Sequence, residues 1–262
     1  MRVIVVGASG FVGAAVVDAV TGLGHDVVQV RAPRIAANEA AADVESHIPA
    51  VNELAAAMVG ADSVVNCSGN PDASAQDAGE LLAANAASPA VVARAACQAA
   101  VGRLIHVSSA VVQGRRPVLD ESNATEEFSP YALSKAEGER RVRREFPTAT
   151  VYRPPSVHGS TRRVTSMTAK IASSPLATVA APGTQPSPQA LIGNVASAVA
   201  FLATSAVATP GIVIHPWEGL TSQDVMSLLG GKRPLVLPRP LASPGDSRGS
   251  ADRWVKMDRS AS

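Results

Sequence analysis

Short apolar runs recur along the first half of the chain, and longer stretches with a helical pattern separate them. The runs are rich in β-branched residues and occupy positions 2–6, 26–30, 63–69 and 103–109. Strands that are apolar at nearly every position are typical of a sheet buried on both faces, as parallel sheets are. Helical patterns lie between them, at 11–21 and 85–100. The alternation predicts an α/β fold built on a doubly wound, Rossmann-like parallel sheet.

The second half continues this pattern with weaker signals. Residues 149–159 are expected to form a sixth strand and its exit, and residues 211–215 a last strand of the same sheet. We expect 1–155, joined by 190–216, to form the dinucleotide-binding domain, with 156–189 and 217–262 as a small interleaved substrate region and tail. The tail is rich in Pro, Arg and Ser, and about its last dozen residues are expected to be disordered.

A glycine-rich turn follows the first strand directly. Gly7, Gly10 and Gly13 lie between that strand and a helical pattern, and a second strand follows. In this context the first glycine permits a tight turn, the second lets the backbone approach a pyrophosphate, and the third allows close packing of helix on strand. The helix start offers N–H groups and a positive dipole end to phosphates. The turn therefore predicts a dinucleotide site.

The residues after the second strand bear on the choice of cofactor. Arg31 and Arg34 stand there, and no Asp or Glu occurs at the strand end. An acidic residue would bind the ribose hydroxyl of NAD, whereas arginine accepts the 2′-phosphate of NADP. We expect NADP(H) to be preferred, with NAD(H) as the alternative.

Tyr131 and Lys135 are the candidates for proton transfer. Side chains at positions i and i+4 of a helix share one face, and a nearby ammonium favours the phenolate form of tyrosine. Ser129 is a good N-cap and Pro130 suits the first helical position, so Tyr131 is expected in the first turn. Residues 137–144 are heavily charged and are expected to form a solvated face.

The glycine spacing and the Tyr-x-x-x-Lys motif together resemble the short-chain dehydrogenase/reductase superfamily, and the chain is most similar to its NAD(P)-dependent epimerase/dehydratase branch. The resemblance covers about residues 1–230. It implies that Ser109, at the end of the fourth strand, positions a substrate carbonyl. It also implies that Tyr131 donates a proton to the carbonyl oxygen, and that Lys135 lowers the pKa of the tyrosine and holds the nicotinamide ribose.

Other site residues follow from the turn, the arginines and this resemblance. The expected cofactor contacts are Gly7, Ser9, Gly10, Phe11, Val12, Gly13, Arg31, Arg34, Asp43, Val44, Cys67, Ser68, Lys135 and Pro154. The expected substrate contacts are Ser109, Ser156, Arg162 and Arg163. Asn85 is assigned a structural role.

Two departures from the family pattern narrow the expected chemistry. Ala110 and Val111 stand where the family's dehydratases carry Asp-Glu, and these side chains cannot move a proton, which argues against a dehydratase. Ser156 replaces an Asn that in the family often holds the sugar nucleotide, and this replacement weakens the assignment of a nucleotide-sugar substrate. The resemblance implies an NADPH-dependent reductase of a ketone, by analogy a nucleotide-activated 4-keto-6-deoxy sugar. The alternatives are an epimerase with bound NAD, a reductase of a non-sugar ketone and, last, a non-catalytic NADP-binding regulator.

Composition adds mainly exclusions. The net charge of +1 provides no field that would recruit nucleic acid or an anionic membrane. The two cysteines, Cys67 and Cys97, lack metal-ligand spacing and are expected to be buried. No apolar run reaches about 18 residues. We expect a cytoplasmic protein with a small-molecule substrate and no metal, and a homodimer is one option for its assembly.

Overall fold

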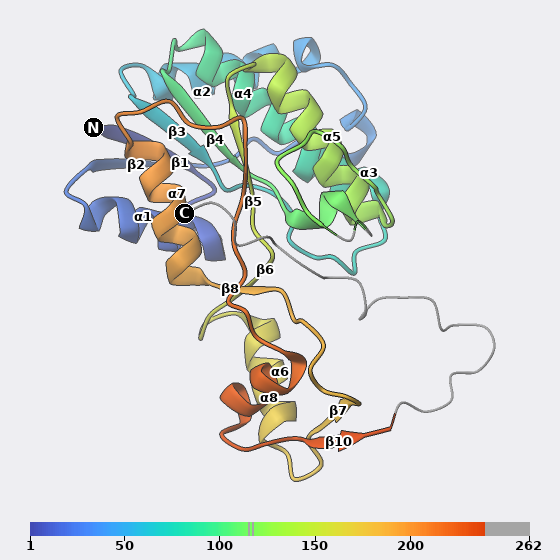
Figure 1. Ribbon diagram of the computed structural model, residues 1–262. Coiled ribbons are helices and arrows are strands. Elements are labelled where there is room, and N and C mark those ends of the chain that lie inside the picture. The colour runs from blue at the N-terminus through green and yellow to red at the C-terminus, as the bar shows by residue number, and fades with distance from the viewer. Residues whose placement is uncertain (115, 117, 239–262) are drawn as a thin grey trace. The chain divides into compact units, whose positions relative to one another are not determined.

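The computed structural model describes residues 1–114, 116 and 118–238, so the predicted disordered tail lies outside the described residues. The chain divides into two compact units (Figure 1). The first unit comprises Met1–Gly114, Glu121–Pro154 and Ile192–His215. Of the described residues, the second comprises Pro155–Leu191 and 216–238, with a short piece that ends at Asp120.

The first unit is built on a six-stranded sheet in the order β2-β1-β3-β4-β5-β9. Every pair of neighbouring strands is parallel. The strands are β1 (Arg2–Val6), β2 (Asp26–Val30), β3 (Ser63–Asn66), β4 (Arg103–Val107), β5 (Thr150–Arg153) and β9 (Ile212–Ile214). The prediction of a Rossmann-like parallel sheet is confirmed, and residues 211–215 do provide its last strand.

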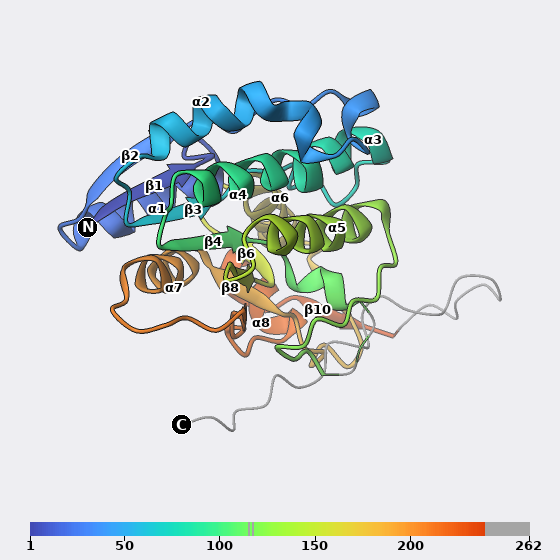
Figure 2. The same ribbon diagram turned by 90° about the horizontal axis from the view of Figure 1, so that it is seen from above.

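Helices cover both faces of this sheet. The helices of the first unit are α1 (Phe11–Gly22), α2 (Ile48–Met58), α3 (Ala78–Leu82), α4 (Ser88–Gln98), α5 (Pro130–Glu145) and α7 (Ile192–Thr204). Helices α1 and α7 pack together on one face, whereas α2, α4 and α5 lie side by side on the other (Figure 2). Apolar side chains of β1, β3 and β4 meet those of α2 and α4 in a buried core.

The strand order reverses between β1 and β3, because β1 has β2 on one side and β3 on the other. In open parallel sheets, ligands bind outside the carboxyl ends of the strands at such a reversal. The carboxyl ends of β1 and β3, at Val6 and Asn66, lie at the same edge as the carboxyl ends of β4 and β5. This edge is therefore where the fold favours a site.

The second unit contains two small parallel sheets and a pair of helices. Strand β6 pairs with β8, β7 pairs with β10, and α6 packs against α8. The elements are β6 (Ser156–His158), α6 (Arg163–Ser173), β7 (Thr178–Ala180), β8 (Gln189–Leu191), α8 (Ser222–Gly230) and β10 (Leu235–Leu237).

Three expectations from the sequence differ from the structure. Residues 149–159 form two strands in different sheets, because Pro154 and Pro155 lack the N–H that a continuous ladder needs. Glu139, expected on a solvated face, is buried at 1% exposure. Cys97 is exposed and not buried. In the described part of the chain, no helix combines the length and apolar character needed to cross a membrane.

Candidate functional site

The glycine turn packs tightly against the end of β3. The N–H of Gly7 donates to the Val30 carbonyl at 3.1 Å, and Gly7 has a φ of +80°. A Cβ on Gly7 would lie 2.8 Å from the backbone nitrogen of Ser68, and a Cβ on Gly13 would overlap the Gly7 carbonyl oxygen. Packing within the protein therefore explains these two glycines.

At Gly10 the packing within the protein is less restrictive than at Gly7 and Gly13. A Cβ on Gly10 would lie 3.3 Å from the Gly7 carbonyl oxygen, which a small shift could relieve. Gly10 is exposed, gives α1 no side-chain cap, and precedes a first turn without acidic residues. Helix starts of this kind suit an anion, because the N–H groups and the dipole both favour negative charge. The turn thus fits the pyrophosphate of a dinucleotide. Ser9 is also exposed, and Phe11 and Val12 are half-buried.

Cys67 and Ser68, which are expected to contact the cofactor, lie beside this turn. The Cys67 N–H donates to the Val6 carbonyl at 2.9 Å, and the Ser68 N–H donates to the Asn66 side-chain oxygen at 3.0 Å. Burial raises the pKa of the Cys67 thiol to about 12. The thiol is therefore neutral and inert at physiological pH, and it acts as a small packing group.

Arg31 and Arg34 are exposed and follow β2 directly. The hydrogen bond from the Gly7 N–H to the Val30 carbonyl brings the end of β2 against the glycine turn. Arg31 is the next residue along the chain after Val30. Exposed arginines that follow this strand end are suited to bind a phosphate, because arginine presents several donors in a planar fork.

Asp43 and Val44 have other partners. The Asp43 carboxylate is 77% exposed and lies 3.6 Å from the guanidinium of Arg144, which is in the last turn of α5. Val44 is 3% exposed and packs in the core with α2 and α4. Asp43 therefore pairs with a cation of α5 and Val44 is part of the core, and the cofactor contacts expected of both stay predictions.

Helix α5 begins as the sequence predicts and carries Tyr131 in its first turn. The Ser129 hydroxyl accepts the Ala132 N–H at 3.1 Å, and Pro130 is the first helical residue. The Lys135 ammonium donates to the Val107 carbonyl at 3.2 Å and is 6% exposed. A Cβ on Gly69 would lie 3.6 Å from the Lys135 nitrogen. The ammonium is thus held at the ends of β3 and β4, the favoured edge of the sheet.

Burial lowers the pKa of Lys135 to about 8, while Glu139 and Cys67 act in the opposite direction. The side chain is therefore mostly an ammonium ion at neutral pH. A cation buried this close to its titration point is unusual outside functional sites, where burial and neighbouring charges shift pKa values together.

Ser109 lies at the same edge, directly after β4. Its half-buried side chain caps a short 3₁₀ turn, Ala110–Gln113, by accepting the Val111 N–H at 3.3 Å. The Ala110 N–H donates to the Pro154 carbonyl at 2.9 Å, so Ser109 and Pro154 lie next to each other at the ends of β4 and β5. Ala110 and Val111 bring no carboxylate to this point.

Asn85 braces this edge through its side chain. It is fully buried in a single π-helical turn, Ala83–Ala87, a feature found often at functional sites. Its amide oxygen accepts the Asn70 N–H at 2.9 Å, and its NH₂ group donates to the Ser134 hydroxyl at 3.0 Å. That hydroxyl donates in turn to the Tyr131 carbonyl at 2.8 Å. Asn85 therefore ties the loop after β3 to the first turn of α5.

The second unit holds three of the four expected substrate contacts, Ser156, Arg162 and Arg163, together with His158, which was not among them. Exposed Ser156 lies 3.0 Å from His158 Nε2, and His158 Nδ1 lies 3.0 Å from the Thr165 hydroxyl. Arg162 donates to the Val157 carbonyl, whereas Arg163 is exposed at the uncapped start of α6. Burial, followed by the charge of Arg162, lowers the pKa of His158 below its usual range. The sequence feature that points to His158 is its position two residues after Ser156, because such residues share one face of a strand.

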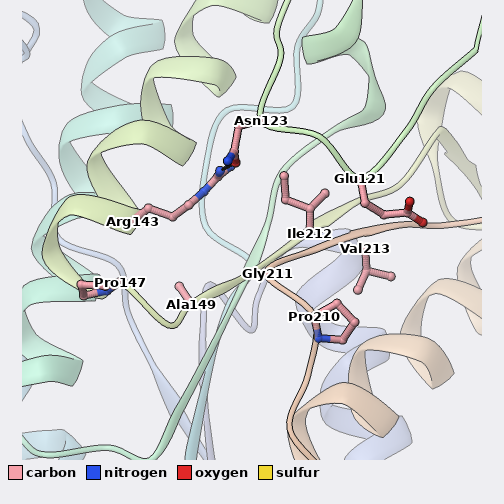
Figure 3. Close-up of a pocket in the computed structure, with 9 residues that line it drawn as sticks. All are labelled: Glu121, Asn123, Arg143, Pro147, Ala149, Pro210, Gly211, Ile212 and Val213. Atoms are coloured by element: carbon pink, nitrogen blue, oxygen red, sulfur yellow. Dashed lines mark hydrogen bonds between the residues drawn. The ribbon is translucent and has the colours of Figure 1, made fainter.

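A pocket of about 550 Å³ lies away from these groups, near the amino ends of β5 and β9 (Figure 3). Its lining consists of Glu121, Asn123, Arg143, Pro147, Ala149, Pro210, Gly211, Ile212 and Val213. Arg143 is in the last turn of α5, at the end opposite Tyr131, and Pro147 follows that helix. The pocket is thus at the edge opposite the carboxyl ends, and the predicted site residues do not line it.

Comparison with known proteins gives the class of the chain. The NAD dependent epimerase/dehydratase family model matches residues 3–213, so the chain belongs to this family. It is therefore an enzyme that uses a nicotinamide dinucleotide, either an oxidoreductase or an epimerase. No curated protein gave a significant match to the chain.

Solved structures share the fold at low sequence identity. A dTDP-4-dehydrorhamnose reductase from Clostridium acetobutylicum has a TM-score of 0.72 and 16% identity, over 91% of this chain and 83% of that one. The same enzyme from Bacillus anthracis, in complex with NADP, has a TM-score of 0.72 and 16% identity, over 97% and 88%. A UDP-glucose 4-epimerase from Thermus thermophilus, in complex with NAD, has a TM-score of 0.68 and 22% identity, over 97% of this chain and 90% of that one.

Proposed function

We propose that this protein is an NADPH-dependent reductase of a ketone, most specifically of a nucleotide-activated 4-keto-6-deoxy sugar. The observation that carries the proposal is the position of Lys135. Its ammonium is buried where β3 and β4 end, one helical turn from Tyr131, at the edge that also holds the glycine turn. A cofactor seated on that turn and a tyrosine at this edge are the two parts that carbonyl reduction needs.

NADPH, when bound, supplies the hydride that adds to the carbonyl carbon. Tyr131 donates its phenolic proton to the carbonyl oxygen as the C–O bond becomes single. Lys135 keeps a positive charge next to the phenol, which favours the phenolate left after proton transfer, and it holds the nicotinamide ribose. Ser109 donates a hydrogen bond to the same oxygen and orients the carbonyl. Its acceptance of the Val111 N–H leaves its own hydroxyl proton available for this bond.

Two features favour net reduction over the other chemistries of the family. Arg31 and Arg34 favour a cofactor with a 2′-phosphate, which suits an NADPH that is exchanged at each turnover. Ala110 and Val111 supply no acid or base beside Ser109, so elimination of water lacks a catalyst there.

Support for a nucleotide-sugar substrate comes from the second unit. Helix α6 begins without a side-chain cap or an acidic residue in its first turn, and Arg163 is exposed at this start. Such a helix start together with an arginine suits a diphosphate. Two of the structural relatives named above are dTDP-4-dehydrorhamnose reductases, which is consistent with this substrate class.

A UDP-glucose 4-epimerase among the structural relatives keeps a second candidate open, because epimerisation by transient oxidation uses the same Tyr, Lys and Ser. Oxidation of NADPH across a panel of keto-sugar nucleotides and simple ketones separates the candidates. A reductase consumes NADPH in proportion to the ketone added. Cofactor bound to the purified protein without net NADPH consumption favours the epimerase, and turnover restricted to simple ketones removes the sugar assignment.

A further inference from the structure

Glu139 lies one helical turn after Lys135 on α5 and is buried at 1% exposure. Its carboxylate accepts four hydrogen bonds. One oxygen accepts from the Ser108 hydroxyl at 2.6 Å and from Arg153 Nε at 2.9 Å, and the other accepts from Arg153 Nη2 at 2.7 Å and Arg143 Nη2 at 2.9 Å. Because Ser108 follows β4 and Arg153 ends β5, this carboxylate fastens α5 to the sheet at the edge that holds the candidate site.

The elements around Lys135 bring few charges to it. From the end of β3 comes the Cys67 thiol, which burial keeps protonated, with a pKa of about 12. From β4 comes His106, whose pKa is lowered to about 3 by burial first, so that it is neutral. Glu139 comes from α5 itself. Among the described groups that favour the Lys135 ammonium, Glu139 is therefore the one that is charged at neutral pH.

Burial works against this ammonium, because the side chain has lost most of its water and has one carbonyl as a hydrogen-bond acceptor in Val107. A carboxylate one turn away on the same helix face offsets part of that cost, since side chains at i and i+4 are neighbours. Two arginines, Arg143 and Arg153, donate charge-assisted hydrogen bonds to the same carboxylate.

We propose that Glu139 is a positioning residue of the reaction: it keeps Lys135 an ammonium ion and anchors this part of α5 to β4 and β5. The inference deepens the proposed function and rests on it, because the ammonium matters only if Lys135 serves Tyr131 and the cofactor. Glu139 itself touches neither substrate nor cofactor in this account.

The direct test is a titration of the Lys135 side chain by NMR. The chain has four lysines, so protein labelled with ¹³C at lysine Cε gives few signals, and Lys135→Met assigns the one of interest. Glu139→Gln is expected to move the titration midpoint of Lys135 to lower pH by about one unit, because it removes a negative charge one helical turn away among buried side chains.

Glu137→Gln is the matched control. Glu137 is on the same helix and loses the same charge, but it faces Arg140 and Arg141 at the surface. Glu137→Gln should leave the Lys135 midpoint unchanged. Glu139→Asp keeps the negative charge, so its Lys135 midpoint should lie close to that of the native protein. A Lys135 midpoint that is the same in folded Glu139→Gln as in the native protein would overturn the proposal.

Glu139→Gln leaves Arg153 buried without its counter-charge, so this variant could fail to fold. The double variant Glu139→Gln, Arg153→Gln removes both charges and takes its place. A smaller shift to lower pH is expected, because Glu139 and not Arg153 is among the groups that act on Lys135, and an unchanged midpoint again counts against the proposal. The titration does not depend on activity. An enzyme that shows the shift but reduces no ketone keeps the role of Glu139 and loses the proposed function. An active reductase whose Lys135 midpoint does not respond to Glu139→Gln keeps the proposed function and loses the role of Glu139.

Discussion

The ends of β1 and β3 meet where Gly7 lies against Ser68, so closely that a Cβ on Gly7 would be 2.8 Å from the Ser68 backbone nitrogen. This contact places the glycine turn at the reversal of the strand order, with Cys67 beside it. It also separates two reasons for glycine in one turn. Gly7 and Gly13 are required by packing within the protein, whereas a Cβ on the exposed Gly10 would meet the Gly7 carbonyl oxygen at 3.3 Å, which a small shift could relieve.

The first prediction uses this difference. Gly7→Ala should cost more than about 3 kcal/mol of the free energy of unfolding, because a left-handed φ and a backbone clash coincide. Gly10→Ala should fold with nearly native thermal stability but bind NADPH at least about tenfold more weakly, since its Cβ intrudes on the phosphate site. Calorimetric melting and NADPH titration measure the two effects. Equal loss of stability in both variants would contradict the assignment of Gly10 to the ligand.

The second prediction concerns the cofactor phosphate. Replacing both Arg31 and Arg34 by Ser should lower the ratio of kcat/KM for NADPH to that for NADH by about tenfold or more, because the 2′-phosphate loses its cationic partners. Arg140→Ser, at an exposed position of α5, should leave the ratio unchanged. Native enzyme that uses NADH as well as NADPH would sink the proposed preference.

The third prediction follows from the buried ammonium of Lys135. Its pKa in the folded protein is about 8, below the ordinary value of 10.5, because of burial. Activity that needs the ammonium should be present below about pH 8 and lost as the pH rises through that value. Between these two values the unfolded chain binds the proton more tightly, so this group's contribution to the free energy of unfolding rises with pH. Activity and stability should therefore move in opposite directions over that range.

The variant Lys135→Met makes the same point at fixed pH. It removes a charge whose burial is unfavourable at neutral pH, so we expect a protein about 1–2 kcal/mol more stable at pH 7 and nearly inactive. Urea unfolding and ketone reduction measured on one preparation test it. A variant that is both less stable and inactive would show that Lys135 is mainly a structural cation.

The fourth prediction concerns the second unit. Arg163→Gln should raise the KM for a nucleotide-sugar substrate by about tenfold with little change in kcat, because a charge-assisted contact to a phosphate is lost. Lys170→Gln removes the same charge near the other end of α6 and should change the KM little. If the two variants behave alike, the start of α6 has no special part in binding.

The parts of this account that the sequence predicted depend on neighbours close along the chain. The glycine turn and the Ser129-Pro130 helix start are local patterns, and the structure has both where the residues indicated. Residues 137–144 show the limit. A charged run predicts a solvated face, yet Glu139 is buried, because its partners Ser108 and Arg153 come from strands far from it in sequence.

The same limit applies to Asp43 and His158. The cofactor contact expected of Asp43 stays a prediction, and the partner that the structure gives this residue, Arg144, is distant in the chain. His158 is held by a hydrogen bond with Thr165 on the next helix, and a turn in the chain brings the two residues together. Pairing across loops is decided by tertiary packing, which short patterns do not carry.

Ketone-dependent oxidation of NADPH in two tyrosine variants is the decisive measurement for Tyr131 as the proton donor. Tyr131 and Tyr152 are the two tyrosines of the chain, and Tyr152 is buried in β5, where its hydroxyl lies 2.5 Å from His215. Tyr131→Phe should lower kcat about a hundredfold or more while NADPH still binds, because the proton donor is lost. Tyr152→Phe should reduce stability and leave most of the turnover. Near-normal turnover by Tyr131→Phe would contradict the proposed mechanism.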